Sequence, residues 1–391
     1  MTAVSGSSEE NAPSLLLCFS HLRWNFVFQR PQHLLTRAAA IYKIVYFEEP
    51  VFEKVEQGFM RVDNPARRLR VVTPVLPAGT APATSIRLQR GFVDRLLTSI
   101  PHRERLLWYY TPIALRFSGH VARDLCIYDC MDELSAFKGA PLELTDLEGV
   151  LFGAADVVFT GGQSLYEAKR ALHPSAHLFP SSIDATHFNQ ARYGGIDPLD
   201  QAEIPHPRIG FFGVIDERMD LELVAGTAAA MPRAHFVMLG PIAKIDPASL
   251  PRADNLHWLG NKSYKDLPSY LAHWQAGWMP FALNDATRYI SPTKTPEFLA
   301  AGLPVVSTAV LDVVRSYGAT GLVGIADASD MPAKLRLLLK RPRGKWLKEV
   351  DAHLANMSWD RTWAEMATLI ARAKELRKAV AVSEARSCST G

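Results

Sequence analysis

The sequence lacks the features that mark membrane-spanning, secreted and metal-rich proteins. No apolar run reaches the roughly 18–20 residues that a membrane-spanning helix needs. The stretch from Met1 to Pro13 is polar and acidic, without the positive and apolar regions of a signal peptide. Only four cysteines occur, and we interpret Cys18, Cys126 and Cys130 as small buried apolar residues, because none has partners at metal-ligand spacing. We therefore expect a cytoplasmic protein in a reducing compartment.

A strong excess of one charge is also missing. The formal net charge is +3, which gives no support to a nucleic-acid partner. The 48% hydrophobic and 21% charged shares are those of an ordinary globular protein. Between Arg61 and Arg123, however, eleven arginines stand against three acids. This segment is either a solvated basic face or a contact for phosphates, on a lipid-linked acceptor or peripherally on the inner face of the plasma membrane.

Short apolar runs alternate with helical patterns in both halves of the chain. Such alternation predicts an α/β protein with parallel sheets and helices on both faces. A glycine- and proline-rich linker, 191–207, separates two Rossmann-like domains, 1–190 and 208–358, and an amphipathic helix follows at about 359–378. Ligands are expected in the cleft, beyond the carboxyl ends of the strands. The strand-like runs are 15–20, 43–48, 69–75, 106–110, 125–130 and 157–160, then 208–214, 235–240, 255–260, 277–281, 304–308 and 321–326.

The segment 291–308, SPTKTPEFLAAGLPVVST, has the residue types of a phosphate-binding loop. Lys294 precedes a short helix that carries Glu297, and a buried strand follows. A helix N-terminus with a lysine beside it favours a phosphate, and a carboxylate can accept hydrogen bonds from two ribose hydroxyls. The alternative is that Glu297 only complements the helix dipole and that Lys294 is a solvated loop residue.

This segment resembles the nucleotide-sugar site of family-4-like GT-B glycosyltransferases, where a proline-and-lysine loop precedes E-x-L-A-x-G-x-P-V-V. The resemblance covers about residues 15–375. It implies that Glu297 binds the donor ribose and that Ser291, Thr293 and Lys294 bind the diphosphate. In such enzymes the C-terminal helix crosses back to the N-terminal domain, and the two domains close on the donor.

Two neighbouring segments extend the resemblance. The stretch 211–220, FFGVIDERMD, implies that Gly213 and Arg218 lie beside the donor phosphates, and 255–271 implies that Tyr264 lies near the base. Many retaining members carry a second Glu eight residues before the ribose Glu, but Tyr289 occupies that position here. We therefore expect an inverting enzyme. UDP is the nucleotide that the resemblance implies.

The stretch 21–34, HLRWNFVFQRPQHL, resembles the opening loop of glycosyltransferases from bacterial cell-surface polysaccharide pathways. These include teichuronic acid enzymes and, more distantly, the glucuronosyltransferase of xanthan assembly. We expect His21, Trp24 and Arg30 to bind the acceptor: Trp24 with Phe26 can stack on a sugar, and Arg30 can meet an acid or a phosphate. The alternative is that they fix the loop to the core.

The segment 128–133, YDCMDE, places three carboxylates at the end of a buried strand. An inverting transferase needs a carboxylate that removes the proton of the acceptor hydroxyl. By resemblance to the xanthan enzyme, we predict Asp132 as this base and Asp129 as the residue that orients it. The alternative is that one aspartate caps the next helix. We expect no metal, because no D-x-D follows a strand in the donor domain.

The sequence thus predicts a glycosyltransferase of surface polysaccharide or glycolipid synthesis, with a nucleotide sugar as cosubstrate and a saccharide or lipid-linked acceptor. Two other functions remain open at this point. A nucleotide-sugar epimerase of the same fold would release a changed sugar nucleotide without an acceptor. An inactive sugar-nucleotide-binding scaffold would bind UDP without turnover.

Overall fold

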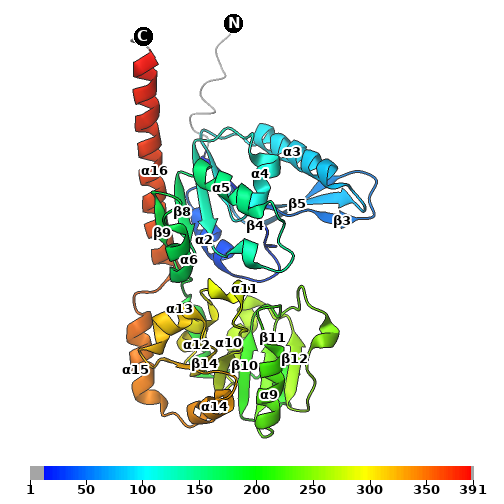
Figure 1. Ribbon diagram of the computed structural model, residues 1–391, viewed down its shortest axis with the longest axis vertical. Helices are drawn as coiled ribbons and strands as arrows, with labels where there is room; N and C mark the ends of the chain where they lie inside the picture. The colour runs from blue at the N-terminus through cyan, green and yellow to red at the C-terminus, as the bar shows by residue number, and fades with distance from the viewer. Residues whose placement is uncertain (1–12, 389–391) are drawn as a thin grey trace.

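The buried apolar runs form two separate sheets, each covered by helices, and the two domains meet end to end (Figure 1). The computed structural model describes residues 13–388. In the first domain the sheet order is β3-β5-β2-β1-β6-β7-β8-β9, with β4 paired to β5. The strands are β1 (Leu15–Ser20), β2 (Lys43–Glu48), β3 (Val51–Glu53), β4 (Phe59–Ala66), β5 (Leu69–Pro77), β6 (Arg105–Tyr109), β7 (Leu125–Cys130), β8 (Val157–Thr160) and β9 (Ala176–Leu178).

Both faces of the first sheet are buried. Alternate residues of β1 point to opposite sides, so Leu16 and Cys18 pack in one apolar cluster while Leu17 and Phe19 pack in another. Helices α2 (Arg30–Ala38) and α16 (Trp359–Cys388) cover one face. The other face is covered by α3 (Pro82–Ser99), α4 (Leu115–Ser118), α5 (Leu144–Ala154) and α6 (Gln163–Lys169).

The edge of this sheet differs from the predicted all-parallel arrangement. Strand β4 runs antiparallel to β5, and β3 extends the sheet beside it. Most of β4 is exposed, so it has no buried apolar run that would predict a strand from the sequence.

The second sheet is parallel throughout, in the order β12-β11-β10-β13-β14-β15. Its strands are β10 (Arg208–Phe212), β11 (His235–Leu239), β12 (Leu256–Gly260), β13 (Ala276–Met279), β14 (Val305–Ser307) and β15 (Val323–Ile325). Its helices are α7 (Ala185–Asn189), α8 (Leu199–Ala202), α9 (Leu221–Ala230), α10 (Leu267–Leu271), α11 (Asp285–Arg288), α12 (Lys294–Ala300), α13 (Leu311–Val313), α14 (Met331–Leu339) and α15 (Arg343–Leu354).

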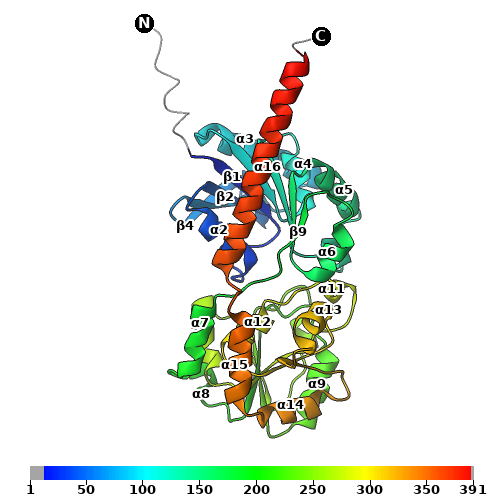
Figure 2. The same cartoon turned by 90° about the vertical axis from the view of Figure 1, so that its left-hand side faces the viewer.

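The chain passes between the domains twice. Phe179 belongs to the core of the first domain and Ile183 to that of the second, so the first passage lies at 180–182. The predicted linker 191–207 packs on the second domain, where Ala191 and Ile204 are buried. Helix α16 then returns, and its buried face, including Trp363, joins the first core (Figure 2). The predicted crossing of the C-terminal helix is confirmed.

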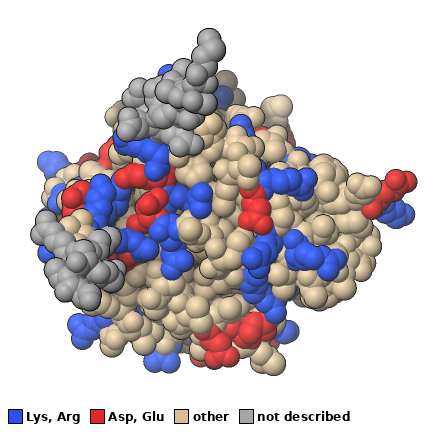
Figure 3. All heavy atoms as spheres, turned by 90° about the horizontal axis from the view of Figure 1, so that it is seen from above, with Lys and Arg blue, Asp and Glu red and all other residues tan. Residues whose placement is uncertain are grey.

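The arginine-rich segment belongs to the first domain, whose outer end is the face seen from above. Lys and Arg are interspersed there with Asp and Glu (Figure 3). Arg61 pairs with Glu53 and Arg116 with Glu143. The apolar face of α3, with Phe92, packs on the sheet and is therefore not available to a membrane. Within residues 13–388, no helix is long and apolar enough to cross a membrane.

Candidate functional site

Three connected cavities lie between the domains, beyond the carboxyl ends of both sheets. The first, of about 370 Å³, is lined by residues after β10, β11, β12 and by α12, with the 24–28 loop of the first domain opposite. The second, of about 90 Å³, shares Lys294 and Thr293 with the first. The third, of about 460 Å³, shares Asp132 and Arg218 with the second. The predicted interdomain cleft is therefore a continuous site.

The first cavity contains five of the predicted donor residues: Gly213, Tyr264, Thr293, Lys294 and Glu297. Gly213 has a φ of 139°, and a Cβ there would lie 2.6 Å from Cε of Lys294. Glycine is thus required for the lysine side chain to lie against the end of β10. The hydroxyl of Tyr264 is buried without a hydrogen-bond partner among the described residues. Ligand atoms could satisfy such a group.

Glu297 and Lys294 give this cavity an unusual electrostatic character. Burial raises the pKa of Glu297 to about 8, and the nearby Lys294 opposes that rise. Burial likewise lowers the pKa of Lys294, and Glu297 opposes that fall. No described residue donates a hydrogen bond to the Glu297 carboxylate, and the ammonium of Lys294 contacts only the Thr293 hydroxyl, at 3.4 Å. Both groups can therefore bind a ligand.

The second cavity gathers the predicted diphosphate residues. Ser291, Thr293, Lys294 and Arg218 line it. Arg218 differs from the expectation of a free phosphate ligand, because its guanidinium already donates to both carboxylate oxygens of Asp216, at 2.6–3.1 Å. A phosphate at Arg218 would meet a partly neutralised cation.

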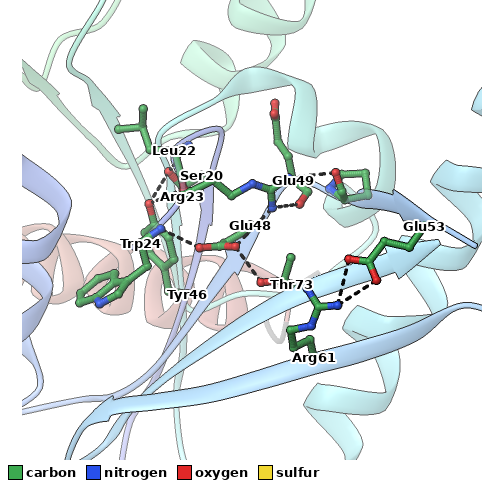
Figure 4. Close-up of polar contacts among 11 residues, drawn as sticks. Ser20, Leu22, Arg23, Trp24, Tyr46, Glu48, Glu49, Glu53, Arg61 and Thr73 are labelled. Carbon is green, nitrogen blue, oxygen red and sulfur yellow. Dashed lines mark hydrogen bonds and ion pairs between the residues drawn. The ribbon is translucent and has the colours of Figure 1, made fainter. Parts of the chain in front are cut away.

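The loop from His21 to Gln29 contributes residues to all three cavities and is fixed by Glu48 at the end of β2 (Figure 4). The Glu48 carboxylate accepts hydrogen bonds from the backbone of Trp24 (2.7 Å), the hydroxyl of Thr73 (2.7 Å) and the guanidinium of Arg23 (3.2 Å). Arg23 also donates to the carbonyls of Glu49 and Pro50. These contacts hold the loop in one conformation.

Trp24 lies differently from the predicted sugar-stacking surface. Its indole is only 8% exposed and packs edge-on against Tyr46, in the first core. Phe26 and Phe28 carry the exposed rings of this loop, at 38% and 40%. Phe28 stacks on Tyr264 of the second domain, with ring centroids 4.5 Å apart. The packing of Trp24 matches the alternative interpretation, in which this residue fixes the loop to the core.

Arg30 and Asp129 contact each other rather than the acceptor or Asp132. Asp129 accepts three hydrogen bonds from the Arg30 guanidinium, at 2.8–3.1 Å, and Arg30 also donates to the carbonyl of Phe179. The Asp129 side chain is 0% exposed and the Arg30 side chain is 2% exposed. Burial raises the pKa of Asp129, and Arg30 counteracts this. The pair joins α2 to β7, whereas the sequence suggested separate roles in acceptor binding and base orientation.

The third cavity contains Asp132, the predicted base, and His21, a predicted acceptor residue. Of the three acids in 128–133, Asp129 pairs with Arg30 and Glu133 pairs with Lys169 at 2.7 Å. Asp132 has no ion pair with a described residue, so its carboxylate can accept a proton from a ligand. Burial lowers the pKa of His21 to about 4, against the influence of Asp132, and its Nδ1 is buried without a partner in residues 13–388. His21 is therefore neutral at pH 7.

The sequence did not single out several residues of this site. Lys138 and Lys244 line the third cavity, and the ring of Phe137 lies beneath both Arg218 and Lys244, at 5.5 and 5.2 Å. Asn261 lines the first cavity and donates to the carbonyl of Phe26 across the domains. These residues lie in loops without a distinctive motif. In the described part of the chain, no group of three or more His, Cys, Asp or Glu could hold a metal ion.

Solved structures resemble the chain over almost its whole length. Sucrose-phosphate synthase from Thermosynechococcus elongatus gives a TM-score of 0.68 at 14% identity, covering 92% of this chain and 98% of that one. The E. coli trehalose-6-phosphate structure bound with UDP-2-fluoro glucose gives 0.64 at 12%, covering 92% and 99%. The chain has the GT-B fold. Identities this low show the architecture of the GT-B cleft and not its substrates.

One curated protein supports the resemblance at the level of sequence. It is a protein of Bacillus subtilis (strain 168) whose name places it in teichuronic acid biosynthesis as a glycosyltransferase, and it is 26% identical over 235 residues. These residues are 55% of this GT-B chain and 58% of the relative, so the chain spans less than two thirds of that protein. No protein-family profile matches. The predicted resemblance to GT-B enzymes of bacterial surface polysaccharides is thus confirmed.

Proposed function

We propose that this chain is a glycosyltransferase that moves a sugar from a UDP-sugar to an acceptor hydroxyl, in the synthesis of a surface polysaccharide or glycolipid. The observation that carries the proposal is the continuity of the three cavities. Lys294 belongs to both the first and the second, and Asp132 to both the second and the third. A nucleoside, a diphosphate and an acceptor therefore have adjacent places in one cleft.

In the donor half, Glu297 accepts hydrogen bonds from the ribose hydroxyls, and Tyr264 and Gly213 bound the nucleoside cavity. Lys294, with Ser291 and Thr293, binds the diphosphate. The ammonium stabilises the negative charge that develops on the departing UDP. Arg218 contributes less than Lys294, because Asp216 already neutralises part of its charge. Residues of this chain thus supply positive charge at the leaving group.

In the acceptor half, Asp132 takes the proton of the attacking hydroxyl. The acceptor oxygen forms a bond to the anomeric carbon while the bond from that carbon to the UDP oxygen breaks, and its electron pair leaves with UDP. Attack opposite the leaving group inverts the anomeric carbon. The neutral His21 beside Asp132 can hydrogen-bond an acceptor hydroxyl without competing for its proton. The reaction as proposed uses no metal.

The trehalose-phosphate synthase of Burkholderia xenovorans supports a saccharide acceptor. It was solved in complex with glucose-6-phosphate and gives a TM-score of 0.64 at 11% identity, covering 91% of this chain and 99% of that one. Lys138 and Lys244 of the third cavity suit an anionic group on the acceptor. An acidic or phosphorylated saccharide is the acceptor chemistry that this lining favours.

The proposal is tested by mixing the protein with a panel of UDP-, GDP- and ADP-sugars and following melting temperature and product formation. We expect UDP-sugars to stabilise the protein most. Asp132→Asn is expected to lower transfer about 10²- to 10⁴-fold, the usual contribution of a general base, while UDP affinity stays within about twofold. Glu133→Gln is the matched control, because Glu133 is bound to Lys169.

Three results would contradict the proposal. An Asp132→Asn variant with full activity would remove the base assignment. A changed sugar nucleotide formed from donor alone would indicate an epimerase. UDP binding without any turnover across the donor panel, with a broad set of saccharide acceptors, would indicate a scaffold protein.

A further inference from the structure

A fourth cavity lies inside the first domain, away from the donor site. It is a half-open pocket with a volume of about 350 Å³, lined by the ends of β1 and β2, the first half of α3 and the 111–117 segment. Aromatic and aliphatic side chains dominate its wall: Phe19, Phe47, Phe52, Ile86, Ile113 and Phe117. We refer to it as the apolar chamber.

Most polar side chains of the chamber wall are already bound to protein groups, whereas the Glu49 carboxylate and the Thr111 hydroxyl have no hydrogen bond to a described residue. Glu48 accepts its three hydrogen bonds from the loop and β5, and the Ser20 hydroxyl is bonded to Tyr46 (Figure 4). The Gln89 amide donates to Ser85, and Arg116 pairs with Glu143. Among the described residues, the buried acceptor atom of this wall without a partner is Oε1 of Gln89, which can bind one water or hydroxyl. The chamber therefore offers its occupant chiefly hydrocarbon contact.

The chamber adjoins the third cavity of the cleft. Glu49, Thr111 and Ile113 line both spaces. The guanidinium of Arg23, held by Glu48 and the carbonyl of Pro50, fixes the shared wall (Figure 4). At the other side of the chamber, Phe52 is 52% exposed. Because Glu49 of the shared wall is exposed, the tail of a molecule bound at Asp132 can reach the chamber over this side chain.

We propose that the chamber binds the aliphatic chain of a lipid-linked acceptor, with its saccharide beside Asp132. This deepens the transferase function proposed above and rests on it, because it assigns the chain to the acceptor. Adjacency to the acceptor cavity, and a mainly apolar wall in which most polar groups are satisfied, favour a hydrocarbon over a second sugar. A dry 150 Å³ cavity takes benzene, so this volume suits roughly 10–15 carbon atoms.

The proposal predicts a dependence of affinity on chain length. Each methylene buried from water strengthens binding about fourfold, the fold-change that corresponds to its transfer free energy. We therefore expect n-alkyl β-D-glucopyranosides from ethyl to octyl, all below their micelle concentrations, to bind at least about tenfold more tightly for every two methylenes added. Calorimetry measures their affinities, with UDP affinity measured on the same samples.

Two substitutions on adjacent positions of α3 locate the binding site. Ile86→Trp fills the chamber, whereas Arg87→Trp places the same ring on the exposed face of the helix as a matched control. Ile86→Trp should abolish the chain-length dependence, Arg87→Trp should retain it, and both should bind UDP as the wild type does. Phe52→Glu, at a half-exposed position that tolerates charge, should weaken octyl glucoside about tenfold even if Ile86→Trp does not fold.

The outcomes separate this proposal from the transferase function. Equal affinities for ethyl and octyl glucoside, or a chain-length dependence that both Ile86→Trp and Phe52→Glu retain, overturn the chamber assignment and leave UDP binding untouched. If the wild-type protein does not bind UDP, this result contradicts the transferase function instead. A dependence that disappears in the chamber variants and persists in Arg87→Trp supports the chamber.

Discussion

Arg30–Asp129 in the first domain and Lys294–Glu297 in the second are pairs of oppositely ionisable side chains in buried surroundings, and their hydrogen bonds separate a structural role from a binding role. Arg30 and Asp129 in the first domain satisfy each other with three hydrogen bonds. Lys294 and Glu297 in the second domain lie close enough to influence each other's pKa but form no ion pair within 4 Å. A buried polar or ionisable group without a protein partner is costly unless a ligand completes it. Hydrogen-bond inventory, rather than burial or charge alone, distinguishes the donor site from the scaffold.

The largest effect is expected when the Arg30–Asp129 pair is broken. Asp129→Asn leaves the buried Arg30 without its counter-charge, so we expect the free energy of unfolding to fall by about 3–5 kcal/mol in urea denaturation. The control is Glu365→Gln, which removes one partner of the exposed pair Arg361–Glu365 and should cost at most about 0.5 kcal/mol. The double variant Arg30→Met, Asp129→Leu should recover most of the loss. A small loss in Asp129→Asn would contradict the structural role.

The second effect concerns the binding pair. Lys294→Met keeps the length of the side chain and removes its charge, so UDP affinity should fall about 10- to 100-fold, or about 1.4–2.8 kcal/mol. Uridine affinity should fall much less, because uridine has no phosphate and loses only the help that Lys294 gives to the ionisation of Glu297. Lys345→Met, at a residue 93% exposed, is the control. Calorimetry with both ligands measures the difference, and equal losses for UDP and uridine would show that Lys294 supports the cavity rather than the diphosphate.

The sequence predicted the buried strands and the donor loop, but not which basic residues the acids contact. The buried runs that form β1, β2, β7 and β10 were predicted within two residues, because continuous apolar runs are a strong local signal. The edge strand β4 was missed, because its residues are mostly exposed. In the donor loop, sequence-adjacent residues form the site, so a motif could place Lys294 and Glu297 in one cavity.

The contacts of the acceptor half could not be predicted from the sequence, for a physical reason. Asp129 and Arg30 are 99 positions apart, and only the parallel sheet brings β7 beside α2. No local pattern therefore distinguishes Asp129 from Asp132, although one is fully paired and the other is free for a ligand. Lys244 has a φ of 60°, an unusual backbone conformation for lysine, and such a conformation leaves no signal in the residue type.

The smallest expected effect is a pH dependence of uridine affinity. Because burial raises the pKa of Glu297 to about 8, the carboxyl group is mostly protonated at pH 6–7 and accepts ribose hydrogen bonds poorly. Raising the pH ionises it, so uridine affinity should increase by up to about tenfold per pH unit between pH 6 and 8. Glu297→Gln cannot ionise and should give a flat profile by calorimetry. A flat wild-type profile, or tighter binding at low pH, would mean that the ribose does not meet an ionised Glu297.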